Sequence, residues 1–595
     1  MQSDHNAVLA NAAQPRAPRP WRELEFWLVV LLALGIYGTR LTDLTIRGEE
    51  PRWACVAQQM IASGDYIVPR LQGTPFPDRP PLNSWAMIAA SRLTGELNLA
   101  AIRLPTVLAT VLTVALIYLY GRNYLSRGGA LAAAAAYATM GQVLQLGRVA
   151  ESDALLTLFL TAALLGWHAA YDRRHDPRLA WLVGYPLAAL AALCKGPQGP
   201  IYFVAITATC LALARDWRFL FSRWHLAGLT AFVAIVALWQ VPFALALEPA
   251  AAWRVWTEEG NLGTRFQVAS WSRALAHWGE FPLEVFGVLL PWSFLLPVAA
   301  TRWFWQSAGT ARPMAVFVVT AFAVAFPTCW LPVESRPRYL MALFPCVALL
   351  VGLIVQRSSE AEQIGWWRRS WDNYVATGIA LVLAAPLVVG GLYCFGGARL
   401  RDLAQSNSPL LLACYATAAL AAAGLAHWSR SRPLERRQSL GMLSLAGFMG
   451  LSYTGIVVNV QMHTSNDPSA QVAAIRDALP PGEQLQSFGR VHHLFAYYYQ
   501  QPIPLNELVE NVAPADTDAQ YFCFSVDPGF ETPAVPFAWQ PVAEISCERA
   551  ESDNPRAKVI VGRRVAEVAS RPLRPALIDA AVMPATLQSS AARND

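Results

Sequence analysis

The sequence contains few charged residues and almost no lysine. Only 15% of its 595 residues are charged, against roughly 25% in soluble globular proteins, and 55% are hydrophobic. Lys195 and Lys558 are the only lysines, so arginine carries nearly all of the positive charge. The formal net charge is +5, and the arginines are spread over many loops rather than gathered in one stripe, which argues against nucleic-acid binding. The composition is that of a polytopic membrane protein.

The sequence also shows no cysteine motif and no repeat, and its first apolar run is not expected to be a cleaved leader. None of the nine cysteines forms a CxxC pair or has metal-ligand spacing, so a zinc or dithiol motif is not expected. There is no repeat of fixed period. The first apolar run, near residue 24, has no clear small-residue cleavage site, which indicates an uncleaved helix. Residues 1–23 are predicted to form a disordered cytoplasmic arm, and 571–595 a disordered tail.

About thirteen apolar segments approach the roughly 20 residues that a helix needs to cross a bilayer. If the N-terminus is cytoplasmic, every second connection carries arginine, as the positive-inside rule requires. An odd number of spans then places the C-terminus outside, so we expect a multi-pass protein of the bacterial inner membrane. The segments are 24–41, 99–121, 128–146, 154–171, 179–194, 199–214, 226–247, 281–300, 313–331, 339–356, 374–396, 409–428 and 438–459.

Three segments on the expected outer side are long enough to hold chemistry: 42–98, 248–280 and 460–570. In the last one, strand-like runs alternate with helical ones, which predicts a small periplasmic α/β domain. Cys523 and Cys547 both lie in this domain and are candidates for a disulfide in an oxidising compartment. The expected fold class is an all-α polytopic membrane protein, whose transmembrane domain covers 24–459, with this α/β domain at its C-terminal end.

The first outer loop carries two helix patterns. Two glutamates precede Pro51, a residue suited to the first turn of a helix, and Gly64 is suited to end that helix. Pro81 and Gly95 frame a second helix in the same way. Apolar residues recur at helical spacing inside both segments. The pattern fits two half-embedded helices at a membrane surface, and it equally fits two connecting helices with solvated ends.

Charged residues accumulate on the expected outer side from segments far apart in the sequence. Ionisable groups near the hydrocarbon are costly and therefore indicate function. Arginine forks match phosphate oxygens, a lysine adds a point charge, and a carboxylate can act as a general base. Any single member could instead be a snorkelling or loop-capping charge, but their convergence predicts a site for a charged group such as a lipid phosphate. The members are Glu49, Glu50, Arg52, Asp78, Arg79, Arg148, Glu151, Asp153, Lys195, His277, Glu334, Arg336 and Arg338.

Several motifs resemble those of a known enzyme family. The first loop contains Glu-Glu-Pro-Arg-Trp at 49–53, Gly-Asp-Tyr-Ile-Val-Pro at 64–69 and Asp-Arg-Pro-Pro-Leu at 78–82. Lys-Gly-Pro at 195–197 and Arg-Pro-Arg-Tyr-Leu at 336–340 follow. Over residues 24–356 their order and spacing resemble the polyprenyl-phosphate-sugar glycosyltransferases. That family includes the aminoarabinose transferases of lipid A and is related to the protein O-mannosyltransferases.

The resemblance implies an inverting transferase of the C-type glycosyltransferase architecture, which uses a polyprenyl-phosphate sugar at the outer face of the membrane. The proposed base of the family stands where this chain has Glu49, next to Glu50. The family usually has aspartate there, so the side chain is one methylene longer, and the choice between Glu49 and Glu50 stays open. Asp153 matches a second acidic position of the family and is predicted to be catalytic as well, as the alternative to Glu49 for removing the proton of the acceptor hydroxyl.

The resemblance also implies a donor-phosphate site and, in related transferases, a metal site. Arg52 and Lys195 match residues that hold the phosphate, and Arg79 stands where the family often has lysine. The full donor-phosphate set is Arg52, Arg79, Lys195, Arg338 and Tyr339. Asp78 and His277 match positions linked to a divalent metal, although two ligands scattered in the sequence do not define a metal site.

Two other functions fit parts of the sequence. A polyprenyl-lipid flippase or transporter would also have many spans and buried charges. However, the ionisable residues lie toward one membrane face, and no inverted repeat is visible. An inactive lipid-binding relative is the second alternative, because the aspartate-to-glutamate change falls on the proposed base. Within the transferase interpretation, a hydroxyl or phosphate of lipid A, another glycolipid, a cell-wall polymer or a protein would serve as acceptor.

Overall fold

The computed structural model describes residues 19–257, 270–333, 335–360, 365–527, 530–547 and 557–565. Most of the predicted arm, the whole predicted tail and part of the second long loop lie outside these ranges. The described chain divides into two compact units. The first consists of the residues up to Leu44 together with Pro77–His463, and the second of Thr45–Phe76 together with the residues from Thr464 onward.

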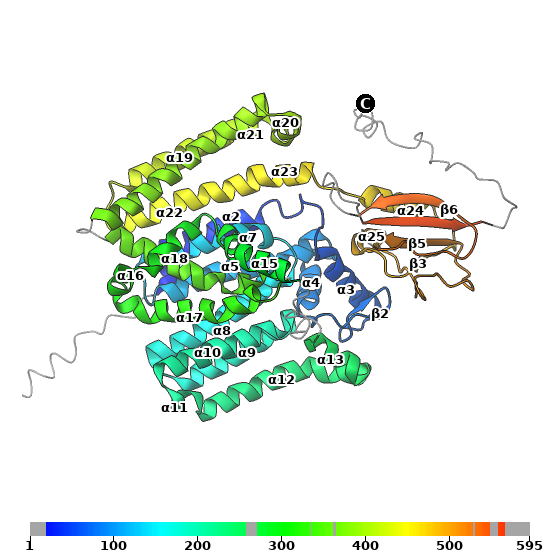
Figure 1. Ribbon diagram of the computed structural model, residues 1–595, viewed down its shortest axis with the longest axis horizontal. Coiled ribbons are helices and arrows are strands. Elements are labelled where there is room, and N and C mark those ends of the chain that lie inside the picture. Colours follow the sequence, from blue (N-terminus) through cyan, green and yellow to red (C-terminus); the bar gives the residue numbers. More distant parts are fainter. Residues whose placement is uncertain are drawn as a thin grey trace, which may run out of the picture. The chain divides into compact units, whose positions relative to one another are not determined.

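Among the described residues, nine helices are long and apolar enough to cross a membrane, or up to ten if a pair bent by 117° counts as one span (Figure 1). The bent pair is α15 (Trp271–Val288) and η2 (Trp292–Ala300). The nine spans are built from α5 (Leu99–Gly121), α8 (Ser152–Arg174), α9 (Pro177–Lys195), α12 (Arg223–Ala246), η3 (Gly309–Ala311) with α17 (Arg312–Trp330), η4 (Pro337–Leu343) with α18 (Phe344–Glu360), α19 (Gly365–Phe395), α21 (Pro409–Ser429), and α22 (Leu434–Leu451) with η5 (Ser452–Val457) and α23 (Val458–His463).

Three of the predicted spans are shorter helices: α2 (Leu24–Gly38), α6 (Arg127–Ala138) and α10 (Gln198–Ala214). The 12 residues of α6 are about 18 Å long at 1.5 Å per residue, less than the roughly 30 Å of the hydrocarbon core. The predicted segment 128–146 breaks after α6, and α7 (Gly141–Leu146) follows. The described chain therefore has fewer span-length helices than the thirteen apolar runs suggest.

The short helix α6 lies at the centre of the first unit. All its residues from Gly128 to Ala138 are buried. Its small side chains allow α18 to come close, since a Cβ on Gly352 would lie 2.6 Å from the Gly129 carbonyl oxygen. A helix made largely of alanine and glycine can therefore be buried on every side and still pack tightly.

An ion pair ties the start of α2 to the end of α5. Arg122 donates from Nε and Nη2 to the two carboxylate oxygens of Glu23, at 2.7 and 3.0 Å. The Tyr118 hydroxyl donates to the same carboxylate at 2.6 Å. This bidentate arrangement is the geometry in which arginine and carboxylate interact most strongly.

The second predicted helix of the first outer loop is confirmed as α4 (Leu82–Thr94). Pro81 stands at its N-cap, and Gly95 ends it in the left-handed region with φ 88°. This conformation is one that glycine adopts without steric cost. The other elements of the first unit are η1 (Pro20–Arg22), α11 (Trp217–Leu220), α13 (Pro249–Thr257), α16 (Arg302–Ser307) and α20 (Ala398–Gln405).

The second unit contains the first predicted helix and a mixed sheet. Helix α3 (Glu50–Ser63) begins with Pro51 in its first turn and ends at Gly64, as predicted. The sheet has the order β4-β3-β5-β7-β6, with β3 parallel to β4 and β5, and β7 antiparallel to β5 and β6. The elements are β1 (Arg70–Leu71), β2 (Thr74–Pro75), α24 (Ser469–Ala478), β3 (Leu485–Phe488), α25 (His493–Tyr499), β4 (Leu505–Asn506), β5 (Tyr521–Val526), β6 (Trp539–Ser546) and β7 (Lys558–Arg564).

The candidate disulfide is not formed. Cys523 lies on β5 and Cys547 directly follows β6, and both are free, buried thiols. Strand β7 separates β5 from β6, so two inter-strand spacings of about 4.8 Å lie between the cysteines. That separation exceeds the reach of a disulfide, whose Cα atoms are rarely more than about 6.8 Å apart. The domain is therefore held by its buried apolar side chains.

Candidate functional site

Asp153 and Lys195 form a buried ion pair in the first unit. Asp153 lies in the first turn of α8, and Lys195 is the last residue of α9. The Lys195 ammonium donates to Asp153 Oδ1 at 2.7 Å, and both side chains are almost fully buried. Their burial means that each charge depends on the other for compensation. Two residues of the predicted site thus meet from neighbouring helices.

Two arginines of the predicted set are held at the same end of α8. Arg79 Nη1 donates to Ser152 Oγ at 2.9 Å, and Arg338 Nη1 donates to Glu151 Oε2 at 2.8 Å. Because Glu151, Ser152 and Asp153 are consecutive, one helix start collects an arginine from the first loop, an arginine from η4 and a lysine from α9. Sequence reasoning placed Glu151 among the converging charges but gave it no role, and it missed Ser152.

Tyr339 belongs to the same cluster. The ammonium of Lys195 lies 5.1 Å from the centre of its ring, and the guanidinium carbon of Arg338 lies 5.7 Å from it. Both distances are within the range of cation–π attraction. The Tyr339 carbonyl accepts a hydrogen bond from Gln198 Nε2 at 2.8 Å. This cluster of Arg79, Glu151, Ser152, Asp153, Lys195, Arg338 and Tyr339 is called the α8 cluster below.

The two glutamates at the start of α3 have different environments. Glu50 is fully buried, and its Oε2 accepts the Arg47 backbone N–H at 3.0 Å. Glu49 stands at the N-cap with 29% of its side chain exposed, and its Oε2 lies 2.8 Å from Arg52 Nη1. Glu50 therefore caps the chain before the helix, while Glu49 presents a partly exposed carboxylate beside a guanidinium.

Arg52 has a second partner that the sequence did not indicate. Its Nε donates to His493 Nε2 at 3.0 Å, and its guanidinium carbon lies 6.0 Å from the ring centre of Phe76. Burial, followed by the positive charge of Arg52, lowers the pKa of His493 to about 3. The imidazole is therefore neutral at physiological pH, as an acceptor of an arginine N–H must be. No local pattern links residues 52 and 493, so only the folded chain reveals this contact.

The predicted metal pair has little support in the geometry. Among the residues that the structure describes, no group of three or more His, Cys, Asp or Glu side chains is arranged to hold a metal ion. The ring of His277 packs against Phe281 with centres 5.1 Å apart. Structural and catalytic metal sites generally use at least three protein ligands. The metal at Asp78 and His277 stays a prediction.

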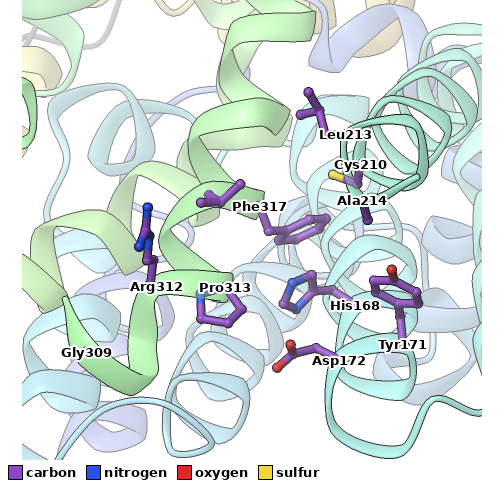
Figure 2. A pocket seen from close by; sticks show the side chains of 11 residues that line it. His168, Tyr171, Asp172, Cys210, Leu213, Ala214, Gly309, Arg312, Pro313 and Phe317 are labelled. Carbon is purple, nitrogen blue, oxygen red and sulfur yellow. The ribbon is translucent and has the colours of Figure 1, made fainter. Parts of the chain in front are cut away.

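A cavity of about 490 Å³ lies at the opposite end of α8 (Figure 2). His168, Tyr171 and Asp172 of α8 line it together with residues of α10 and α17. The rings of His168 and Phe317 stack there with centres 4.1 Å apart. His168 lies about 22 Å along the helix from Asp153 at 1.5 Å per residue. The cavity is therefore separate from the α8 cluster and contains none of its residues.

Comparison with known proteins defines the class. Residues 78–240 match the family described as dolichyl-phosphate-mannose-protein mannosyltransferase. The fold is similar to that of ArnT from Cupriavidus metallidurans in the apo state, with a TM-score of 0.66 and 17% identity over 90% of this chain and 97% of that one. The same protein bound to undecaprenyl phosphate gives a TM-score of 0.63 and 16% identity, over 91% and 98% of the two chains. The chain is a multi-span membrane glycosyltransferase that uses a polyprenyl-phosphate sugar, as the motifs predict.

Within this class the chain is similar to the undecaprenyl phosphate-alpha-4-amino-4-deoxy-L-arabinose arabinosyl transferases. The Pseudomonas paraeruginosa protein is 28% identical over 416 residues, which cover 68% of this chain and 71% of that protein. The Edwardsiella ictaluri protein is 30% identical over 353 residues, or 56% of this chain and 59% of that protein. The predicted fold class, a helical membrane protein with a C-terminal α/β region, is confirmed.

Proposed function

We propose that the chain transfers 4-amino-4-deoxy-L-arabinose from undecaprenyl phosphate to lipid A, at the outer face of a bacterial inner membrane. The observation that carries the donor is the similarity over 68% of the chain to an enzyme named for that donor. The acceptor rests on the resemblance of the first-loop motifs to the aminoarabinose transferases of lipid A. The orientation, with the N-terminus inside and the C-terminal domain outside, rests on the arginine-rich connections.

The α8 cluster is proposed to bind the donor phosphate. Arg79, Lys195 and Arg338 supply the positive charge, and Asp153 and Glu151 hold two of these cations in place. Undecaprenyl phosphate leaves as the bond between the anomeric carbon of the sugar and the phosphate oxygen breaks, so negative charge develops on the phosphate. Cations fixed in advance at that position stabilise the transition state without reorganising. Arg52, which the motif resemblance also assigns to the donor phosphate, is kept as a proposed phosphate-binding residue.

Glu49 is proposed as the general base. The acceptor oxygen, from a hydroxyl or a hydrogen phosphate group, attacks the anomeric carbon opposite the leaving phosphate and inverts it. The proton of the acceptor passes to the Glu49 carboxylate. The partial exposure of Glu49 favours it over the fully buried Glu50, whose side chain is already engaged by the Arg47 N–H. Asp153 is the counter-ion of Lys195, so its proposed part in the reaction is to orient that lysine.

A transfer assay tests the proposal. Purified full-length protein in lipid vesicles is given radiolabelled undecaprenyl-phosphate aminoarabinose, other polyprenyl-phosphate sugars in parallel, and lipid A. We expect label on lipid A from the aminoarabinose donor, and loss of transfer in Glu49→Gln. Glu96→Gln, which changes an exposed carboxylate before α5, is the control and should keep full activity. Chelation with EDTA, followed by addition of Mg²⁺ or Mn²⁺, tests the predicted metal.

Other outcomes identify the alternatives. Label transferred from a different donor, or to another envelope component, keeps the transferase class and changes the substrates. Binding of undecaprenyl phosphate without transfer from any donor would instead indicate a flippase or an inactive lipid-binding relative. Full transfer by Glu49→Gln would refute the assignment of the base.

A further inference from the structure

The first-loop segment that contains α3 is fastened to the C-terminal domain by the side chains of Gln72 and Cys55. The Gln72 side chain donates to Ser487 Oγ at 2.9 Å and accepts the Val491 N–H at 2.9 Å. Cys55 of α3 donates from Sγ to the His493 carbonyl at 3.7 Å. These residues are about 420 positions apart but belong to one compact unit. The helix that Glu49 precedes is thus part of the same compact unit as the C-terminal domain.

The shortest route from that domain to the candidate base runs through two side chains. His493, the first residue of α25, accepts the Arg52 Nε–H at 3.0 Å. In turn, Nη1 of Arg52 lies 2.8 Å from Oε2 of Glu49. A free arginine side chain populates many rotamers, so a guanidinium anchored at Nε explores far fewer positions. The hydrogen bond at Nε leaves the Nη2 edge as a donor for a further group.

We propose that His493 is a positioning residue for the transferase, because it holds the Arg52 guanidinium in the place where that group binds the donor phosphate. Through the contact between His493 and Arg52, the C-terminal domain orients the start of α3. This inference rests on the proposed function and assigns a task to a domain whose sequence indicated none. His493 touches neither the sugar nor the phosphate in this scheme. Its effect reaches the reaction only through Arg52.

Three properties of the contact support this task. The acceptor atom is a neutral ring nitrogen, so the histidine holds the guanidinium without adding a second negative charge to that of Glu49. Arg490 stacks on Phe76 with its guanidinium carbon 5.4 Å from the ring centre, and Arg52 approaches the same ring. The domain therefore contributes a second guanidinium and a shared aromatic surface beside the anchored one. Finally, α25 begins at the anchoring residue, so the position of His493 follows that of the whole helix.

Binding of undecaprenyl phosphate to the full-length protein in nanodiscs tests the inference without depending on transfer. His493→Leu removes the acceptor and keeps the bulk, and His493→Gln restores an acceptor oxygen. We expect His493→Leu to weaken binding about 10-fold, close to the effect of Arg52→Leu, and His493→Gln to regain most of it. His492→Asn is the control. It changes the neighbouring histidine to a residue that can still cap α25, and it should bind as the wild type does.

The double variant separates positioning from structural support. If His493 acts through Arg52, then His493→Leu adds no further loss to Arg52→Leu. An additional 10-fold loss in the double variant, or unchanged binding in either single variant, overturns the inference. The same variants are then measured in the transfer assay, where a displaced guanidinium should lower kcat/KM of His493→Leu by 10- to 100-fold. Absence of transfer in the wild-type protein refutes the proposed function alone, because the binding comparison still decides the role of His493.

Discussion

The buried pair of Asp153 and Lys195 allows a sharp test of how the α8 cluster is held. At 2.7 Å and an effective dielectric constant of about 20, the attraction between the two charges is about 6 kcal/mol. Desolvation of the two ions offsets most of it, but removal of one partner leaves an uncompensated charge and costs about 3–5 kcal/mol. Lys195→Met and Asp153→Asn should each lose that much stability. The double variant, which leaves no charge unpaired, should lose far less than the sum.

The measurement is reversible unfolding in mixed detergent micelles, together with the transfer assay. The other lysine of the chain supplies the control: Lys558 pairs with Glu544 on the exposed side of the sheet. Lys558→Met should therefore change stability by at most about 1 kcal/mol. We expect the double variant to regain stability but not transfer, because Lys195 is gone. A double variant as unstable as the sum of the two single changes would refute the view that charge compensation holds the pair.

Three further predictions follow from contacts elsewhere in the chain. Glu49→Gln should lower kcat by about 10²-fold or more, as expected for loss of a general base. Glu50→Gln keeps an acceptor for the Arg47 N–H and should retain most activity. Equal losses of the two variants in transfer assays would contradict the distinction between the two glutamates. Gly352→Ala should destabilise the protein by about 1–3 kcal/mol through overpacking, while Gly424→Ala, which meets nothing within 4 Å, should be neutral or slightly stabilising in the same unfolding measurement. Burial of His493, followed by the positive charges of Arg52, His492 and Arg490, lowers the pKa of this histidine from 6.5 to about 3. His493 therefore takes up its proton at a higher pH in the unfolded chain than in the folded one. Stability should therefore fall as the pH drops from about 6.5 toward 3, and unfolding curves at several pH values should show a shallower decline for His493→Gln.

Much of the local structure could be predicted because its causes are local. A proline at the start and a glycine after the last turn set the limits of α3 and α4, and both helices have the predicted bounds to within a residue. The composition determined the membrane class, and the strand-like runs after residue 460 determined a mixed α/β region. The number of span-length helices was overestimated, because an apolar run such as 128–146 contains a break that hydropathy does not register.

The candidate site was predicted as a set of residues but not as a set of contacts. Motif order pointed to Arg79, Lys195 and Arg338, since fixed cations suit a phosphate. Which carboxylate each cation would meet depends on how α9 and η4 pack against the start of α8, and that packing is decided by side chains far away in the sequence. Glu151 and Ser152 therefore received no role before the fold was known.

The amino-acid sequence was enough to predict that this chain spans a membrane, where its first-loop helices begin and end, and which types of side chain its chemistry would use. These features follow from composition, periodicity and helix capping, which act over a few residues. The tertiary structure alone decided that Glu50 is buried while Glu49 is not, and that Lys195 pairs with Asp153. It alone brought His493 to Arg52 across 441 residues. Such contacts arise from the packing of whole helices and domains, so no short stretch of sequence contains the information that specifies them.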